Sequence, residues 1–143
     1  MAENRIYAGI ETEQRVVVVG SNVAPGTPLI ISGQPVVTLT GSGDYVNTRT
    51  IVAGDSTTTI SRASSGGVGL LPTQATVTPT GTFAFPVTGA TVASRGLKVY
   101  LTAAGLLTLT AGSAPANAPY GAVDFFRGEI SATDTAVKIG INL

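Results

Sequence analysis

Apolar residues recur along this chain in short runs, and no stretch forms a convincing helical stripe. Runs rich in β-branched residues alternate with glycine, proline, asparagine and aspartate. At the end of the chain, Val137, Ile139 and Ile141 alternate with small or polar residues. Period-two alternation puts successive side chains on opposite faces of a strand. The pattern predicts an all-β fold, a small β-barrel or a β-tulip/sandwich, with little helix.

Several runs have the length and the flanking turns of individual strands. The valine run within 15–20 predicts a strand that is buried on both faces. Phe83 and Phe85 are two residues apart, so they should point to the same side of a strand and into the core. The threonine-rich runs 45–52 and 56–62 are only modestly apolar, which predicts a strand pair with one exposed face. Further strands are expected at 28–32, 35–40, 120–126 and 136–143, with loops at 21–27 and 113–119.

The most apolar stretch, 97–112, could be a short helix, a membrane-seeking segment or a hairpin. A helix would place Gly105 in its interior and would contain several poor helix formers. The longest apolar runs in the chain have four residues, whereas a membrane-spanning helix needs about 20. A hairpin with a loop at 103–105 is therefore favoured. Its residues expected in the core or in subunit contacts are Leu97, Val99, Tyr100, Leu101, Leu107 and Leu109.

Composition narrows the classes of function. The chain has 143 residues, which favours one domain, and only 11% of them are charged, against roughly 25% in an average soluble domain. The formal net charge is zero and the basic residues are scattered. Nucleic-acid binding is not expected, because phosphate contacts usually require a basic excess. The N-terminus has no apolar core of the signal-peptide kind, so we expect synthesis in a cytoplasm.

The chain contains no cysteine and no histidine. Disulfides, cysteine-based zinc sites and the Ser–His relay are therefore excluded. Glu11 and Glu13 would share a face in an extended segment, but they lie in a polar run beside Arg15, and a solvated arm explains them better. Glycine-rich 41–43 and 65–67 do not match a phosphate-binding loop. We expect no enzymatic activity and no cofactor.

Two further groups of residues have the chemistry of binding sites, one for a metal ion and one for a sugar. Asp44, Asn47 and Asp55 offer oxygen atoms for calcium, but their spacing matches no EF-hand loop, and aspartate after glycine is common in turns. No metal site is therefore expected. Tyr45 and Tyr120 are candidates for exposed loop aromatics that stack on sugars. They keep open the alternative of a receptor- or carbohydrate-binding β module from a phage fibre or a bacterial surface protein.

The C-terminal half carries a series of short motifs in a characteristic order. They are Val68-Gly69, the run GTFAFPV at 81–87, GLKVY at 96–100 followed by LTAAGLLTLT, YGAV at 120–123, and the closing TAVKIGINL at 135–143. In these motifs the segment from about 67 to 143 resembles the small capsid decoration (cement) proteins of tailed bacteriophages. The PGTPL run at 25–29 looks like the early turn of that family, and 45–62 looks like an insertion relative to its compact members.

The resemblance implies a β domain that binds the outside of an expanded phage head, commonly as a homotrimer at three-fold positions, and stabilises the shell against the pressure of packaged DNA. It implies a flexible N-terminal arm, here 1–14, that adds a strand to the major capsid protein, with Ile6, Tyr7 and Ile10 as anchors. Residues 15–143 would form a single β domain with 45–67 as an exposed insertion. The protein would then reside on the outer surface of the virion, with no membrane or nucleic-acid partner.

Overall fold

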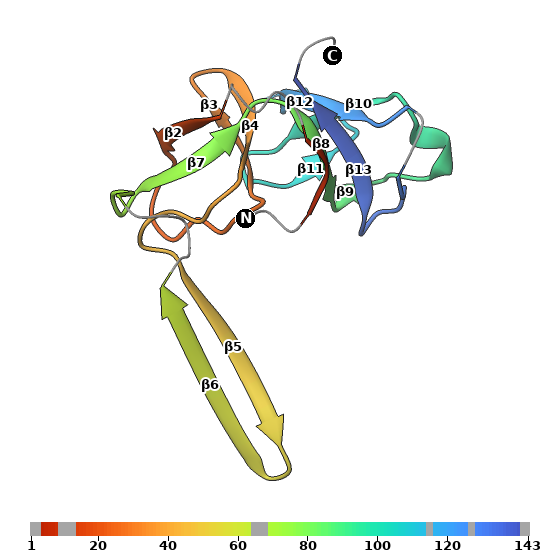
Figure 1. The fold of residues 1–143 in the computed structure, drawn as a ribbon. Coiled ribbons are helices and arrows are strands. Elements are labelled where there is room, and N and C mark those ends of the chain that lie inside the picture. The colour runs from red at the N-terminus through yellow and green to blue at the C-terminus, as the bar shows by residue number, and fades with distance from the viewer. Residues whose placement is uncertain (1–3, 9–13, 64–68, 114–115, 126–127, 141–143) are drawn as a thin grey trace.

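The protein is described here by a computed structural model that covers residues 4–8, 14–63, 69–113, 116–125 and 128–140. The larger of its sheets has seven strands in the order β1-β8-β13-β12-β10-β11-β9 (Figure 1). Every neighbouring pair is antiparallel except β11 and β9, which are parallel. The strands are β1 Arg5–Ala8, β8 Gly81–Phe85, β9 Val87–Thr88, β10 Lys98–Leu101, β11 Leu107–Thr108, β12 Ala118–Val123 and β13 Thr135–Ile139.

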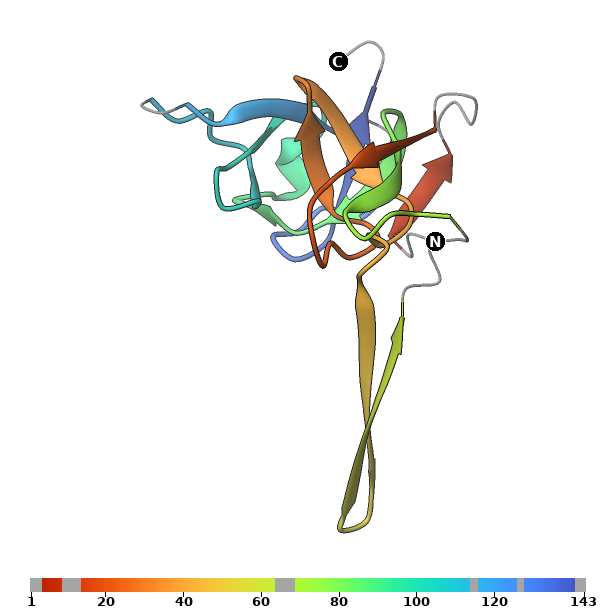
Figure 2. The same cartoon turned by 90° about the vertical axis from the view of Figure 1, so that its left-hand side faces the viewer.

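The smaller sheet has four antiparallel strands in the order β2-β7-β4-β3. They are β2 Arg15–Val18, β3 Pro28–Ile31, β4 Gln34–Thr38 and β7 Gln74–Thr78. The two sheets pack in a sandwich-like arrangement, and neither closes into a barrel in the described part of the chain (Figure 2). The all-β prediction is confirmed, and the sandwich is the architecture that the strands adopt.

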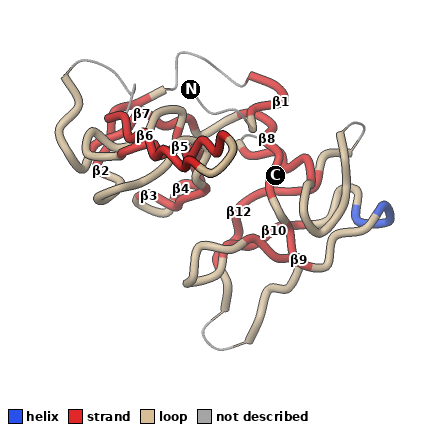
Figure 3. The backbone as a smooth tube through the Cα atoms, turned by 90° about the horizontal axis from the view of Figure 1, so that it is seen from below, coloured by secondary structure: helices blue, strands red, loops and turns tan. Residues whose placement is uncertain are grey.

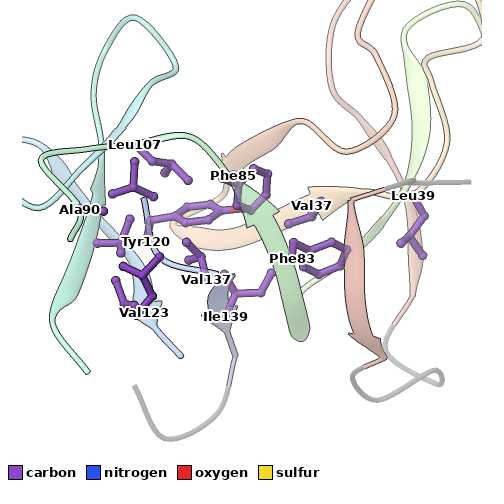
Figure 4. Close-up of a cluster of buried hydrophobic side chains, with 13 residues drawn as sticks. Val37, Leu39, Phe83, Phe85, Ala90, Leu107, Tyr120, Val123, Val137 and Ile139 are labelled. Atoms are coloured by element: carbon purple, nitrogen blue, oxygen red, sulfur yellow. The ribbon is translucent and has the colours of Figure 1, made fainter. Parts of the chain in front are cut away.

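The core lies between the two sheets (Figure 4). Phe83 and Phe85 are both buried, as their spacing predicted, and their ring centroids are 6.2 Å apart. The ring of Tyr120 meets Phe85 edge-on at 6.3 Å, an arrangement that aromatic pairs prefer. The smaller sheet contributes Val37 to the same cluster. Buried apolar area of this kind is the main favourable term in folding.

The third sheet is a hairpin of two long strands, β5 Val46–Ala53 and β6 Ser56–Ala63. These strands pair antiparallel with each other, and the hairpin projects from the sandwich (Figures 1 and 2). A view from below places it on the side of the smaller sheet (Figure 3). The predicted strand pair is confirmed. The prediction of a single exposed face is wrong, because every residue from Thr50 to Ser61 is exposed.

The prediction that 15–20 forms a strand buried on both faces is wrong. Among the residues that the structure describes, strand β2 lies at the edge of the smaller sheet and pairs only with β7. Val16 and Val18 on this strand are 55% and 64% exposed. A continuous apolar run is typical of a strand between two covering layers, but the position of the strand in the sheet decides whether such layers exist.

The expected free arm also differs from the structure. Residues Arg5–Ala8 form β1, which pairs antiparallel with β8 at the edge of the larger sheet. The N–H of Ala84 in β8 donates a 2.7 Å hydrogen bond to the carbonyl oxygen of Asn4. This part of the expected arm is therefore a strand of the protein's own sandwich. Ile10, Glu11 and Glu13 lie outside the described residues.

Candidate functional site

The projecting β5–β6 hairpin is the most prominent surface feature of the molecule, and its turn sets its register. Ala53 and Ser56 are the last paired residues, so Gly54 and Asp55 form a two-residue loop. Gly54 has a φ of +59°, and a type II′ hairpin turn needs such an angle at its first loop residue. From this turn the pairing continues without a shift to Val46 and Ala63.

This register sorts the hairpin residues onto two different faces. Directly opposed residues in an antiparallel pair share a face, and the face alternates along each strand. One set contains only small, hydroxyl-bearing or apolar residues, and we call it the uncharged face: Val46, Thr48, Thr50, Val52, Thr57, Thr59, Ser61 and Ala63. The other set contains both arginines of the hairpin, and we call it the arginine face: Asn47, Arg49, Ile51, Ala53, Ser56, Thr58, Ile60 and Arg62.

The hairpin exposes apolar side chains that the sandwich does not cover. Val46 and Val52 on the uncharged face are 45% and 69% exposed, and Ile51 and Ile60 on the arginine face are 41% and 39% exposed. Eight residues per strand extend roughly 26 Å at about 3.3 Å per residue. The hairpin therefore carries these exposed side chains well away from the body of the domain.

The second candidate surface is the N-terminal strand, which is held at its start by Asn4. The Nδ2 of Asn4 donates hydrogen bonds to the carbonyl oxygens of Ala84 at 3.0 Å and Gly26 at 3.3 Å. Asn4 thus ties β1 both to β8 and to the turn before β3. Ile6, one of the three predicted anchors, is 39% exposed on β1. Tyr7 pairs through its backbone with Thr82, and the predicted anchor Ile10 lies outside the described residues.

The predicted hairpin within 97–112 is confirmed as β10 and β11, with the turn between them containing Gly105 at a φ of +81°. Of the residues expected in the core or in subunit contacts, Val99 and Leu107 are buried. Leu101, Leu109 and Tyr100 are half-buried, and the two leucines pack against the core cluster.

Leu97 departs from this expectation, because it is 50% exposed. It immediately precedes Lys98, the first residue of β10. Two other large apolar side chains are also exposed, Val92 at 83% and Phe125 at 55%. A Cβ atom built on Gly96 would come within 2.6 Å of the Phe125 ring, so the glycine lets this ring lie against the backbone.

The oxygen-rich residues considered for calcium do not come together. Asp44 precedes the base of the hairpin and Asp55 lies at its tip, and the full length of β5 separates them. Oδ1 of Asp44 accepts hydrogen bonds from the Ser42 hydroxyl at 2.6 Å and from the Asn22 N–H at 2.8 Å. These bonds hold the pKa of Asp44 below its ordinary value of 3.8. The carboxylate therefore acts as a local brace for a loop.

Tyr120, expected as a possible exposed aromatic, is 1% exposed. Its hydroxyl donates a 2.7 Å hydrogen bond to the carbonyl oxygen of Val36 on the smaller sheet. Burial raises the pKa of Tyr120 above its ordinary value of 10.0. The other candidate, Tyr45, is half-buried. The sequence offered no signal for the contact between Tyr120 and Val36, because 84 positions separate these residues.

A pocket of about 240 Å³ opens beside Tyr120, between β10, β12 and the start of β4. Among the described residues, its walls are mainly apolar or glycine, and Lys98 is the one charged residue that lines it. The Tyr120 hydroxyl is already engaged by Val36. The described residues contain no group of three or more acidic side chains placed to bind a metal ion. The pocket thus brings together no set of groups for acid–base or nucleophilic chemistry.

Comparisons with protein-family models, with curated proteins and with solved structures found no match to this chain. Among the described residues, the structure contains no helix that is long and apolar enough to cross a membrane. The candidate surfaces of the molecule are exposed strands and apolar side chains held outside a small sandwich.

Proposed function

We propose that this protein is a structural capsid decoration protein. It binds the exterior of an expanded phage head through the major capsid protein, as a homotrimer at three-fold positions, and stabilises the shell against internal DNA pressure. The resemblance of the C-terminal half supports the phage assignment. The observation on the structure that carries the proposal is the β5–β6 hairpin, which exposes apolar side chains along its length and has no role in the sandwich core.

A decoration protein acts by thermodynamic linkage. A ligand that binds the assembled shell, and not its dissociated form, shifts the equilibrium toward the shell by mass action. This task requires affinity and reach but no chemical step. The low share of charged residues and the zero formal net charge suit it, because copies crowded on one surface then repel each other little.

The position of β1 suggests how the N-terminal strand contributes. Because β1 is the last of the described strands in the larger sheet, one row of its backbone N–H and C=O groups faces away from β8. An edge of this kind can pair with an extended segment of another chain. In this proposal β1 stays on the sandwich and the shell protein adds a strand beside it, so the N-terminal segment need not detach from β8.

The direct test is binding to purified, expanded, undecorated heads of the parent phage. We expect the wild-type protein to co-sediment with the heads at saturable stoichiometry and to raise the temperature at which the heads release their DNA. Deletion of 1–14 should weaken this binding strongly. Because that deletion also removes β1, circular dichroism and thermal unfolding must show that the rest of the sandwich remains folded.

A point substitution gives a sharper test of the N-terminal surface. Ile6→Asp places a charge on the exposed side of β1, and we expect it to reduce head binding at least about tenfold, as loss of an apolar contact and burial of a charge do. Leu106→Asp is the matched control, because Leu106 is 63% exposed in the turn between β10 and β11. Equal binding by wild type and Ile6→Asp would refute the role of β1. No binding of the wild type to heads, together with clear hits on a glycan array, would replace the proposal by a carbohydrate-binding function.

A further inference from the structure

We propose that the uncharged face of the β5–β6 hairpin docks against the same face of a second copy of this chain. The proposal goes beyond head binding and rests on the hairpin alone. An isolated two-stranded hairpin is only marginally stable in water, and a third strand or a packed layer is usually needed to stabilise it. This hairpin forms a separate two-stranded sheet, so packing against another molecule would stabilise it.

The residues of the hairpin lack the devices that keep exposed strands apart. Natural edge strands are commonly interrupted by proline, lysine or inward-pointing charges. The segment from Val46 to Ala63 contains no proline, lysine or glutamate, and its single acidic residue, Asp55, lies in the turn. Its pairing also runs without a bulge. A regular strand pair with no charged residue on one of its faces is suited to association through that face.

The chemistry of the uncharged face selects a second copy as the partner. A hydroxyl both donates and accepts a hydrogen bond, so a surface of threonine and serine is complementary to itself. Thr48 and Ser61 already illustrate this within one hairpin, because their hydroxyl oxygens lie 3.3 Å apart and either can donate. Val46 and Val52 add an exposed apolar side chain at each end of the face. Two identical faces can therefore match valine to valine and hydroxyl to hydroxyl.

The distribution of charge supports the same partner. Arg49 and Arg62 belong to the opposite face by the pairing register. Two copies that meet through the uncharged face bring no like charges together and bury no unpaired charge, which would cost several kcal/mol. Contact through the arginine face would bring the arginine-bearing positions of both copies into one interface. Self-association is thus expected on one face and opposed on the other.

The size of the face sets the strength of the contact. Two strands roughly 26 Å long, each about 4.8 Å wide, cover a strip of roughly 250 Å². Stable interfaces bury about 800 Å² on each partner. The hairpin contact is therefore weak in dilute solution and depends on concentration. It becomes effective when copies are held side by side, since the local concentration then exceeds that in solution.

Cysteine trapping tests the contact, because the chain has no cysteine of its own. Thr50→Cys places one thiol near the middle of the uncharged face, and Thr58→Cys places one at a similar height on the arginine face. Both positions are exposed threonines of the same hairpin. Under mild oxidation at high protein concentration, we expect Thr50→Cys to form disulfide-linked dimers at least about tenfold faster, because only its face docks. The rate at which each thiol reacts with a small reagent corrects the two rates of disulfide formation for differences in thiol accessibility.

Sedimentation velocity gives a second measurement without oxidation. The average mass of the wild type should rise with concentration above the mass of the homotrimer proposed above. Thr50→Asp, which would bury a charge in the contact, should abolish this rise, and Thr58→Asp should preserve it. Equal trapping rates for the two cysteine variants, or equal effects of the two aspartates, would overturn the proposal. Head binding by a wild type that shows no preferential trapping at Thr50→Cys would refute this inference alone and leave the proposed function standing.

Discussion

The hydroxyl of Tyr120 donates a 2.7 Å hydrogen bond to the carbonyl oxygen of Val36 and so joins the two sheets of the sandwich. Tyr120 lies on β12 of the larger sheet and Val36 on β4 of the smaller one. The Tyr120 ring also packs edge-on against Phe85. One side chain therefore contributes both to the apolar core and to the polar link between the layers.

Tyr120→Phe should destabilise the protein by about 1–3 kcal/mol, because it removes the donor and leaves a buried carbonyl oxygen without that partner. The ring and its packing against Phe85 are retained, so the fold should not change. Urea denaturation at neutral pH measures the difference. Tyr100→Phe is the matched control, since Tyr100 is only half-buried. A loss at Tyr120→Phe no larger than at Tyr100→Phe would contradict the structural role of the hydrogen bond.

The same residue predicts a pH dependence at the alkaline end. Burial raises the folded-state pKa of Tyr120 above 10.0, so in this range the unfolded chain loses a proton that the folded protein retains. The free energy of unfolding should therefore be unaffected by this residue below about pH 10. Above that pH it should fall by up to about 1.4 kcal/mol per pH unit. In Tyr120→Phe the free energy of unfolding should fall less steeply above about pH 10, because the titrating hydroxyl is absent. Denaturation between neutral pH and pH 11 measures this difference.

Asp44 predicts a pH dependence at the acid end. Its pKa is held below 3.8, first by the Ser42 hydroxyl and then by the Asn22 N–H. A carboxylate with a lowered pKa stabilises the fold above its unfolded pKa, and this contribution is lost as the pH falls through the folded value. An NMR titration should find the Asp44 pKa below 3.8, and Ser42→Ala should move it upward. An unchanged titration in Ser42→Ala would contradict the assigned cause.

The contact between Asn4 and Gly26 predicts a coupling between two remote positions. Gly26 has a φ of +75°, and a Cβ atom there would come within 2.5 Å of Oδ1 of Asn4. Gly26→Ala should therefore cost at least about 1–2 kcal/mol from backbone strain alone, with the steric clash in addition. Asn4→Ala removes the clashing group, so the double variant should lose less than the sum of the single losses. Additive losses in thermal unfolding would refute the contact.

Replacing 46–63 by a short Gly/Ser linker should leave the sandwich folded and change its thermal midpoint little. Within the described part of the chain, the strands of the hairpin pair only with each other, and the core cluster contains no residue of either strand. Flexible loops are also inexpensive in closure entropy. Calorimetry and circular dichroism measure the outcome. A large drop in the midpoint would mean that the hairpin contributes to the stability of the domain itself.

Local pattern predicted much of the fold. The alternation through Val137 and Ile139 identified β13 and its buried face, and the spacing of Phe83 and Phe85 identified two core residues. The strand pair 45–52 and 56–62 was also found in this way. Such features depend on residues two positions apart, and the geometry of a strand relates these residues directly.

The candidate site was less accessible from sequence. The residues expected as free anchors include Ile6, which lies on a paired strand, and the apolar Leu97 is exposed although its alternation predicted burial. The residues on each face of the β5–β6 hairpin follow from the pairing register of its two strands, which the structure supplies. A register depends on which residues form the turn, and a shift by one residue would exchange the faces.

By itself, the sequence determined the all-β class, the position of most strands, and the exclusion of histidine and cysteine chemistry, since these depend on residue type and on local spacing. Only the tertiary structure decided that β2 is an exposed edge, that β1 pairs with β8, and that Tyr120 reaches Val36. The physical reason is that burial and strand order arise from hydrogen bonds and packing between segments far apart in the chain, and no local pattern encodes which segments meet.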